Sequence, residues 1–215
     1  MAPTFSRASL LISALVAVLL TACSVVQNKV EIQYFVLNPA VDSLLEGVDY
    51  EKTKALAVEL GPVEIPNYLN RPHVVTRQGE SSLHFQDNYQ WAGYLRENIS
   101  RVLSRNLAQN LGISQVRILP GTRLPDADYR IEVDIETFEP DATGAVYLSV
   151  QWWVFELDDD VPSISKTTHL RSEALEVVSY PNMVNAMSHT LGLFSQELAR
   201  GLVALEMEIP RQAIP

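Results

Sequence analysis

The clearest pattern in the chain is a strict alternation of polar and apolar residues over positions 128–138. Its apolar positions are Tyr129, Ile131, Val133 and Ile135. Because successive side chains of a β-strand point to opposite faces, this segment is predicted to be a half-buried strand. Residues 145–157 and 163–178 are also rich in β-forming residues, and a short acidic turn joins them. The three segments are therefore predicted to form an antiparallel meander.

Two other stretches repeat apolar residues with the spacing of an α-helix. The first covers about residues 90–111, and its apolar positions are Trp91, Leu95, Ile99, Val102, Leu103 and Leu107. Asp87 or Asn88 is predicted to cap its start, and Gly112 stands where a helix commonly ends. The second covers about residues 181–206, and its apolar stripe consists of Met183, Met187, Leu191, Phe194, Leu198, Leu202 and Leu205. Both stretches are predicted to be amphipathic helices that pack side by side.

Shorter apolar runs predict the remaining strands, at residues 33–37, 55–60, 73–77, 82–86 and 115–119. No internal repeat or linker divides the chain. The expected fold class is α+β, a single domain in which two long amphipathic helices pack on one face of an antiparallel β-sheet. This domain is predicted to cover residues 33–209. A loose tail, residues 210–215, is expected to follow because its prolines cannot continue a helix.

The N-terminal residues have the character of a bacterial lipoprotein signal peptide. Residues 10–20 form an apolar run, whereas a helix needs roughly 20 residues to span a bilayer core. The run ends in Leu20-Thr21-Ala22-Cys23, which matches the lipobox, so residues 1–22 are predicted to be cleaved off. The alternative is an ordinary secreted protein in which a cysteine stands at the cleavage site by chance.

Cys23 is the only cysteine of the chain, so no disulfide can form within it. Cleavage would make Cys23 the new N-terminus and the site of covalent lipid attachment, and more than one acyl chain anchors a protein stably. Residues 23–32 are then the lipidated N-terminus and its tether. Ser24 stands where an Asp would retain an enterobacterial lipoprotein in the inner membrane. We therefore expect the periplasmic face of the outer membrane, with the inner membrane as the alternative.

The charge balance excludes one class of partner. The chain has 16 Lys and Arg against 26 Asp and Glu, and only Arg7 of these precedes the lipobox. The mature chain therefore has a formal charge of −11, with 15 basic residues left. An acidic body is repelled by nucleic acid and by anionic lipid surfaces. We predict no nucleic-acid partner, and we expect the lipid anchor alone to hold the protein at its membrane.

No catalytic or metal-binding constellation occurs in the sequence. The histidines are His73, His84, His169 and His189. Their spacing does not suit a metal site, and neither a Gly-x-Ser-x-Gly elbow nor a P-loop is present. The acidic run Asp158-Asp159-Asp160 is more simply a solvated turn than a calcium loop. We therefore predict a protein that is not an enzyme, with no catalytic residue, no metal and no cofactor other than the covalent lipid on Cys23.

A stiff loop after the second predicted strand is the first candidate for a partner-binding surface. Its backbone is restricted by three prolines, Pro62, Pro66 and Pro72. Tyr68 and Leu69 lie between the last two, so their presentation to a partner would lose little entropy. Arg71 is a candidate for pairing with a partner carboxylate or for bracing the loop. The other interpretation is that Leu69 folds back as a plug over the sheet.

Trp152 and Trp153 are the second candidate for a partner-binding surface. Adjacent residues of a strand point to opposite faces, so one tryptophan is predicted to face the helices and the other to face away. Tryptophan is enriched at protein interfaces. The outward-facing ring is therefore either an interface anchor or a side chain covered by a loop.

The loop and its surroundings resemble the ABC-type transport auxiliary lipoproteins, whose PqiC-like members accompany MCE-type lipid-transport proteins. The segments that carry the resemblance are Gly61-Pro62-Val63, Ile65-Pro66, Tyr68-Leu69, Arg71-Pro72, Val75-Thr76-Arg77 and the helix that follows Trp91. Tyr34-Phe35-Val36-Leu37 is similar to the short aromatic first strand of the family. The resemblance covers essentially the whole mature chain in order and spacing.

This resemblance implies a membrane-anchored auxiliary component of an MCE/ABC-type intermembrane lipid transport system. The protein would dock the transport assembly at the outer membrane. Its expected partners are an MCE-domain protein with its permease system and, through the anchor, the membrane. The resemblance also allows a homo-oligomeric ring around a tubular MCE partner. The rival hypothesis is a lipoprotein that binds a lipid or another small apolar ligand in a pocket between sheet and helices.

Overall fold

The computed structural model describes residues 31–40, 45–121, 127–156 and 159–208. The chain divides into two compact units, Met1–Glu31 and Ile32–Pro215, and all described helices and strands belong to the second unit. The predicted signal peptide, Cys23 and the predicted tail at residues 210–215 lie outside the described residues.

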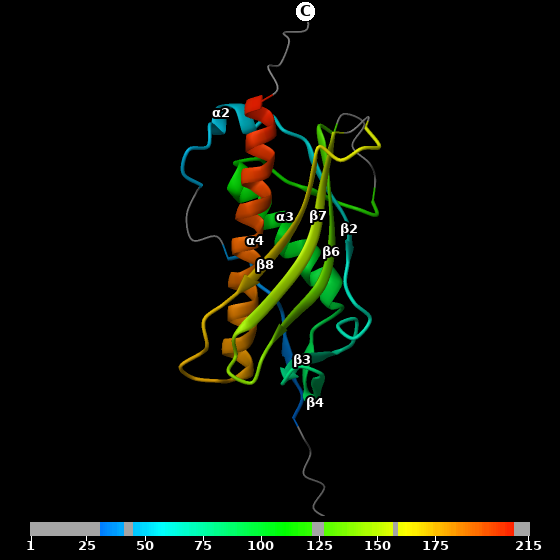
Figure 1. The fold of residues 1–215 in the computed structure, drawn as a ribbon, viewed down its shortest axis with the longest axis vertical. Helices are drawn as coiled ribbons and strands as arrows, with labels where there is room; N and C mark the ends of the chain where they lie inside the picture. The colour runs from blue at the N-terminus through cyan, green and yellow to red at the C-terminus, as the bar shows by residue number, and fades with distance from the viewer. Residues whose placement is uncertain (1–30, 41–44, 122–126, 157–158, 209–215) are drawn as a thin grey trace, which may run out of the picture. The chain divides into compact units, whose positions relative to one another are not determined.

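The elements of the second unit follow one another from the small strand at its start to the long helix at its end (Figure 1). In chain order they are β1 (Gln33–Phe35), α2 (Tyr50–Thr53), β2 (Val58–Glu64), β3 (His73–Gln78), β4 (Ser82–Trp91), α3 (Leu95–Leu111), β5 (Arg117–Ile118), β6 (Tyr129–Pro140), β7 (Val146–Glu156), β8 (Ile164–Arg171) and α4 (Tyr180–Glu208).

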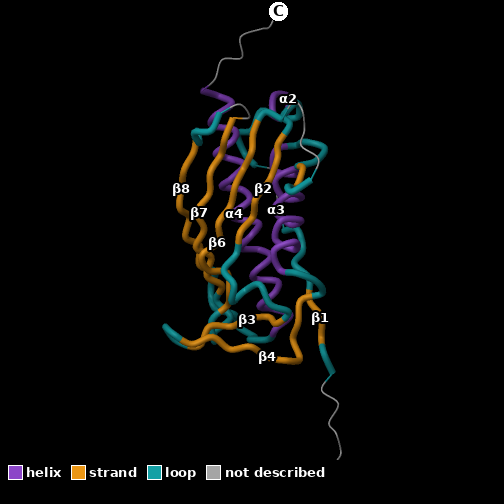
Figure 2. The backbone as a smooth tube through the Cα atoms, turned by 90° about the vertical axis from the view of Figure 1, so that its right-hand side faces the viewer, coloured by secondary structure: helices purple, strands orange, loops and turns teal. Residues whose placement is uncertain are grey.

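The described strands form two sheets (Figure 2). The larger has five strands in the order β5-β2-β6-β7-β8, and the smaller has three in the order β1-β4-β3. β6, β7 and β8 pair antiparallel, as the predicted meander requires, whereas β2 runs parallel to both β5 and β6, and β1 runs parallel to β4. The α+β class is confirmed, but the sheet is mixed and divided. The chain between β2 and β6 includes α3, and a crossover of this kind produces parallel pairing.

The alternation predicted for the longest strands is confirmed on β6. Tyr129, Ile131 and Val133 are at most 3% exposed, whereas Asp134 and Glu136 face solvent. β7 repeats this pattern beside it. The two strands therefore present one continuous apolar face.

The helix α4 covers this face of the sheet over β6, β7 and β8, α3 covers it over β2 and β5, and the two helices pack against each other (Figure 2). Fully buried side chains at the centre of the resulting core include Leu60, Ile99, Ile131, Phe194 and Leu198. Burial of each such side chain contributes about 1.5–3 kcal/mol. The predicted apolar stripe of the last helix is confirmed from Met183 to Leu202. The two long helices on one face of the sheet thus form as expected.

The start of α3 differs from the prediction. Trp91 is the last residue of β4 and is buried, and the helix begins four residues later at Leu95. Neither Asp87 nor Asn88 caps it, because both lie within β4, and the N-cap residue is Tyr94. A strand followed by a helix can keep one apolar face throughout, so the periodicity alone did not locate the boundary. The predicted end at Gly112 is confirmed by its left-handed φ of 68°.

The strand β2 continues through Pro62, where the sequence predicted a loop. Its pairing with β6 shifts register between Leu60 and Val63. An irregularity of this kind accommodates a proline because the missing N–H is not required by the ladder. Val63 and Glu64 consequently form part of the five-stranded sheet.

Candidate functional site

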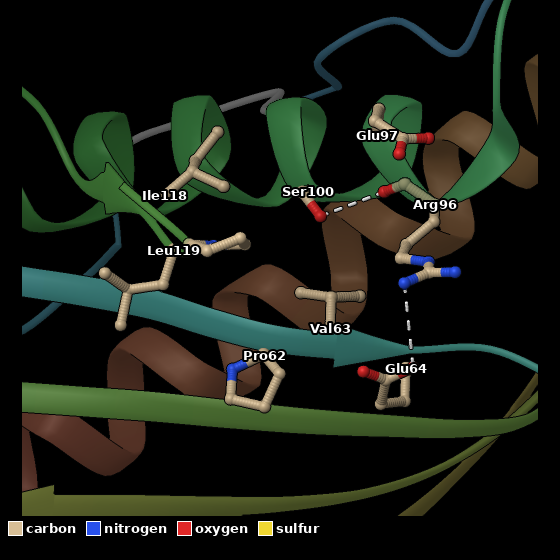
Figure 3. A pocket seen from close by; sticks show the side chains of 9 residues that line it. Pro62, Val63, Glu64, Arg96, Glu97, Ser100, Ile118 and Leu119 are labelled. Carbon is tan, nitrogen blue, oxygen red and sulfur yellow. Dashed lines mark hydrogen bonds and ion pairs between the residues drawn. The ribbon is translucent and has the colours of Figure 1, made fainter. Parts of the chain in front are cut away.

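A groove opens between the second half of β2, the residues that follow β5 and the N-terminal half of α3 (Figure 3). Its volume is about 410 Å³. The lining residues are Pro62, Val63, Glu64, Arg96, Glu97, Ser100, Ile118, Leu119 and Pro120. The apolar lining comes from β2 and from residues 118–120, and the polar lining comes from α3 and the end of β2.

The edge of β2 in this groove lacks a neighbouring strand among the described residues. β5 pairs with β2 only at Glu59 and Leu60, and the Leu119 N–H donates to the Leu60 carbonyl at 2.8 Å. Pro120 then follows and has no N–H to donate. Val63 and Glu64 pair with β6 on their other side. An unpaired strand edge offers backbone donors and acceptors to an incoming chain.

Charged side chains border the groove. Arg96 Nη1 lies 3.9 Å from Glu64 Oε2, and the two side chains are 41% and 57% exposed (Figure 3). Arg96 Nε is buried and has no hydrogen-bond partner within the described part of the chain. Because a long, exposed ion pair contributes little stability, Arg96 can exchange Glu64 for the carboxylate of a ligand.

This arrangement suits binding of an extended segment. The β2 edge can pair with a backbone, the apolar lining can hold a side chain, and Arg96 can receive a carboxylate. Within the described ranges, no three His, Cys, Asp or Glu side chains gather into a metal-binding cluster. None of the helices described there is long and apolar enough to cross a membrane.

The proline-rich loop does not present its apolar pair as predicted. Leu69 is 1% exposed and belongs to the core, so the expectation of an outward Leu69 is wrong. The Leu69 N–H donates to the Pro66 carbonyl at 2.9 Å, and this turn directs the chain inward. The alternative, in which Leu69 folds back as a plug, describes the structure.

Tyr68 is half-buried and takes part in a buried polar cluster. Its hydroxyl donates to Glu139 Oε2 at 2.8 Å, and Glu139 Oε1 accepts from Arg77 Nε at 2.8 Å. Glu139 is fully buried and also accepts the Phe138 N–H at 2.9 Å. We call Tyr68, Arg77 and Glu139 the junction, because they connect the proline-rich loop, β3 and β6.

The junction favours the protonated forms of Tyr68 and Arg77. Burial, followed by the nearby Glu139 charge, raises the pKa of Tyr68 well above its usual value. The hydrogen bond to Glu139 likewise raises the pKa of Arg77. Tyr68 therefore remains a neutral donor and Arg77 remains charged, which suits a structural role for this cluster.

The two tryptophans face opposite sides of β7, as predicted. Trp152 is fully buried, and its Nε1 donates to Thr168 Oγ1 at 3.0 Å. Trp153 lies on the other face and is partly exposed. A fully buried ring cannot anchor a partner at the surface, so Trp153 alone of the pair is accessible. Its role as an interface anchor stays a prediction.

The remaining predicted residues are Arg71 and Cys23. The exposed Arg71 guanidinium lies 5.4 Å from the centre of the Phe85 ring, a contact that braces the loop against β4. Pairing of Arg71 with a partner stays a prediction. Cys23 lies outside the described residues, so lipid attachment there stays a prediction too.

The groove residues Glu64, Arg96 and Ile118 were not identified from the sequence. They come from three separated elements, and no short motif joins them. The sequence did contain one signal for the groove, the prolines at positions 62 and 120, because proline within a sheet occurs at edges and bulges. Two prolines at one sheet edge indicate that the edge is open.

Within the described residues, the fold and the groove define an α+β domain in which the β2 edge beyond Leu60 has no neighbouring strand on the groove side. A family model described as the ABC-type transport auxiliary lipoprotein component matches residues 43–199. The chain belongs to this family, as the resemblance predicted. Membership in a lipoprotein family implies a membrane-anchored, periplasmic protein.

Solved structures show the same fold. Protein XCC0632 from Xanthomonas campestris, of the DUF330 family, is similar with a TM-score of 0.69 and 13% identity, over 82% of this chain and 97% of that one. An uncharacterized protein of known crystal structure is similar with a TM-score of 0.62 and 22% identity, over 80% of this chain and 99% of that one. No curated protein matches the sequence. At these identities the likeness concerns the fold alone.

Proposed function

We propose that this protein is an auxiliary component of an MCE/ABC-type intermembrane lipid transport system. It docks the transport assembly at the periplasmic face of the outer membrane and is not an enzyme. Family membership supports the transport-auxiliary role. The observation that supports docking is the open edge of β2 inside the groove. The expected partners are an MCE-domain protein and its permease system.

An extended segment of the MCE-domain protein would bind along β2 beyond Leu60. Its backbone would continue the five-stranded sheet, and alternate side chains would point into the groove. Ile118 is 37% exposed at the groove wall and would contact an apolar side chain. Arg96 would receive a carboxylate on the same segment.

Site-specific photocrosslinking in cells tests this proposal. The full chain would carry a photoreactive phenylalanine at position 118, together with the MCE-domain protein and its permease. A matched control carries the same residue at Leu193, an apolar position of α4 that is 42% exposed. We expect an adduct with the MCE-domain protein at position 118 and none at position 193.

The other outcomes separate the rival functions. A lipid adduct at position 118 would favour the ligand-binding alternative, which the apolar lining of the groove supports. We place that ligand in the groove. The space between the sheet and the helices is filled by core side chains such as Leu60 and Ile99, which are fully buried. An adduct with a second copy would identify the groove as a homo-oligomer interface. Equal adducts at positions 118 and 193 would contradict docking at the groove.

The membrane anchor is tested separately at Cys23. Cys23→Ser removes the thiol that the lipobox presents, so we expect loss of labelled palmitate and release from the membrane fraction. Separation of outer from inner membrane in the wild type decides between the two locations. A Cys23→Ser variant that still fractionates with the membrane and a wild type without label would together refute the anchor.

A further inference from the structure

A cluster of exposed apolar and aromatic side chains lies where the chain enters the second unit. Ile32, Tyr34 and Val36 alternate along β1 and its flanks and are 43%, 62% and 43% exposed. Tyr94, at the start of α3, is 72% exposed and lines a shallow groove together with Val36. Leu37, the residue after Val36, is fully buried and the intervening Phe35 is partly buried, so the opposite face of this segment points into the protein. We call Ile32, Tyr34, Val36 and Tyr94 the entry surface.

The entry surface is built from uncharged stretches of an acidic protein. Residues 32–40 and 88–95 contain no charged side chain, although the chain has a formal charge of −10. Parallel pairing of β1 with β4 brings the two stretches together. The charged groups at the border are Glu31, Glu97 and Arg101. An uncharged surface avoids the repulsion that the rest of this protein meets at an anionic bilayer.

The tether limits how far this surface can lie from a lipid anchor. Residues 24–31 are the only ones between Cys23 and Ile32. An extended chain covers about 3.3–3.6 Å per residue, so the tether spans roughly 30 Å at most. An anchor at Cys23 therefore keeps β1 close to the bilayer.

We propose that the entry surface lies against the anchoring bilayer, with the Tyr34 and Tyr94 rings at the level of the lipid headgroups. Tyrosine suits this position because its ring is apolar and its hydroxyl reaches water. The proposal rests on lipid attachment at Cys23. It departs from the expectation that the lipid anchor alone holds the protein at its membrane. Glu97 borders both the docking groove and the groove beside Val36, so this contact places the docking groove next to the bilayer.

Environment-sensitive labels on the full-length lipidated protein test the contact. Cys23 is the only cysteine and its thiol is consumed by lipid, so an introduced cysteine is the single labelling site. The test variants are Tyr34→Cys and Tyr94→Cys. Met207→Cys is the control, because Met207 is 75% exposed near the end of α4, at the opposite end of the folded unit from β1 (Figure 1). Each carries a nitrobenzoxadiazole label in phosphatidylethanolamine–phosphatidylglycerol vesicles that contain headgroup-level quenchers.

We expect a blue shift and strong loss of fluorescence for labels at positions 34 and 94, and neither for the label at position 207. Whether the protein floats together with the vesicles shows independently whether the lipid anchor binds the membrane. If the protein floats but all three labels behave alike, the lipid anchor is confirmed and the contact of the entry surface with the bilayer is refuted. If the wild type does not float, the anchor fails and the proposal fails with it. Labels at positions 34 and 94 that are blue-shifted but are not quenched by the headgroup-level quenchers would show a protein interface and overturn the membrane contact.

Discussion

The two sheets are held in the protein by different kinds of interaction. The five-stranded sheet buries one apolar face under α3 and α4, and on β6 every second residue from Tyr129 to Ile135 is in the core. The three-stranded sheet has mostly half-buried or exposed residues along β4 and β1. Its core contribution is limited mainly to Val74, Val75 and Trp91.

Polar and aromatic contacts make up for the small apolar face of the three-stranded sheet. Through the junction, Arg77 of β3 pairs with the buried Glu139 of β6. Tyr89 of β4 stacks on Tyr180, the first residue of α4, with ring centres 3.8 Å apart. A buried ion pair contributes little net stability once desolvation is included, and it penalises arrangements that leave one charge alone. We infer that apolar burial stabilises the large sheet and that the junction selects how the small sheet attaches.

The largest effect is expected when the junction loses its acceptor. Glu139→Ala leaves the Tyr68 hydroxyl and the Arg77 guanidinium without their shared partner, and removal of one member of a buried ion pair costs about 3–5 kcal/mol. Urea unfolding measures this change in the free energy of unfolding. The control is Glu132→Ala, for which a smaller loss is expected because the Glu132 side chain is 28% exposed whereas that of Glu139 is fully buried. Equal losses in the free energy of unfolding of the two variants would show that the junction has no special role in attaching the small sheet.

A cavity in the apolar core should have the next largest effect. Leu198 is fully buried on α4, and Leu198→Ala is expected to lower the free energy of unfolding by about 2–5 kcal/mol. Leu193→Ala on the exposed side of the same helix serves as the control, with an expected change within about 0.5 kcal/mol. Thermal and urea melting of both variants give the comparison. Similar small changes in both would mean that this face of α4 is not core.

The turn between β6 and β7 predicts a dependence on pH. Burial raises the pKa of Asp141, but hydrogen bonds from Thr143 and the Ala145 N–H outweigh it, so the pKa lies below its ordinary value of 3.8. The folded state thus favours the charged form. The charged Asp141 carboxylate therefore stabilises the folded state above pH 3.8. This stabilisation is lost as the pH falls through the lower pKa that Asp141 has in the folded state.

Asp141→Asn removes this charge and keeps the side-chain shape. The variant should be less stable than wild type by about 1 kcal/mol at neutral pH, because hydrogen bonds to a charged acceptor are the stronger ones. The difference should shrink as the pH falls below 3.8. Urea melts from neutral to acidic pH test it, and a difference that does not change with pH would refute the assignment.

The smallest expected effect concerns Arg71, at the edge of the small sheet. Its exposed contact with Phe85 is worth about 0.5 kcal/mol, so Arg71→Ala should leave melting almost unchanged. The same variant in the crosslinking assay reports any role in partner binding. A loss of stability as large as that of Glu139→Ala would instead show that Arg71 supports the junction.

Local patterns in the sequence were sufficient for the parts of the fold that rest on apolar periodicity. They predicted the meander of β6, β7 and β8, the two long helices and the end of α3 at Gly112. They also predicted that Trp152 and Trp153 face opposite ways. These features depend on side chains that are near one another in the chain, where the period of a strand or helix is visible directly.

Only the tertiary structure decided how distant segments meet. The division into two sheets, the parallel pairing of β2 with β5 and β6, and the burial of Leu69 depend on contacts between elements far apart in sequence. The same holds for the groove, where Glu64, Arg96 and Ile118 converge from three elements. Periodicity states which face of a segment is buried but not which partner buries it. The location of the candidate site therefore followed from the fold, while the family was already indicated by the resemblance that the segments around residues 61–77 carry.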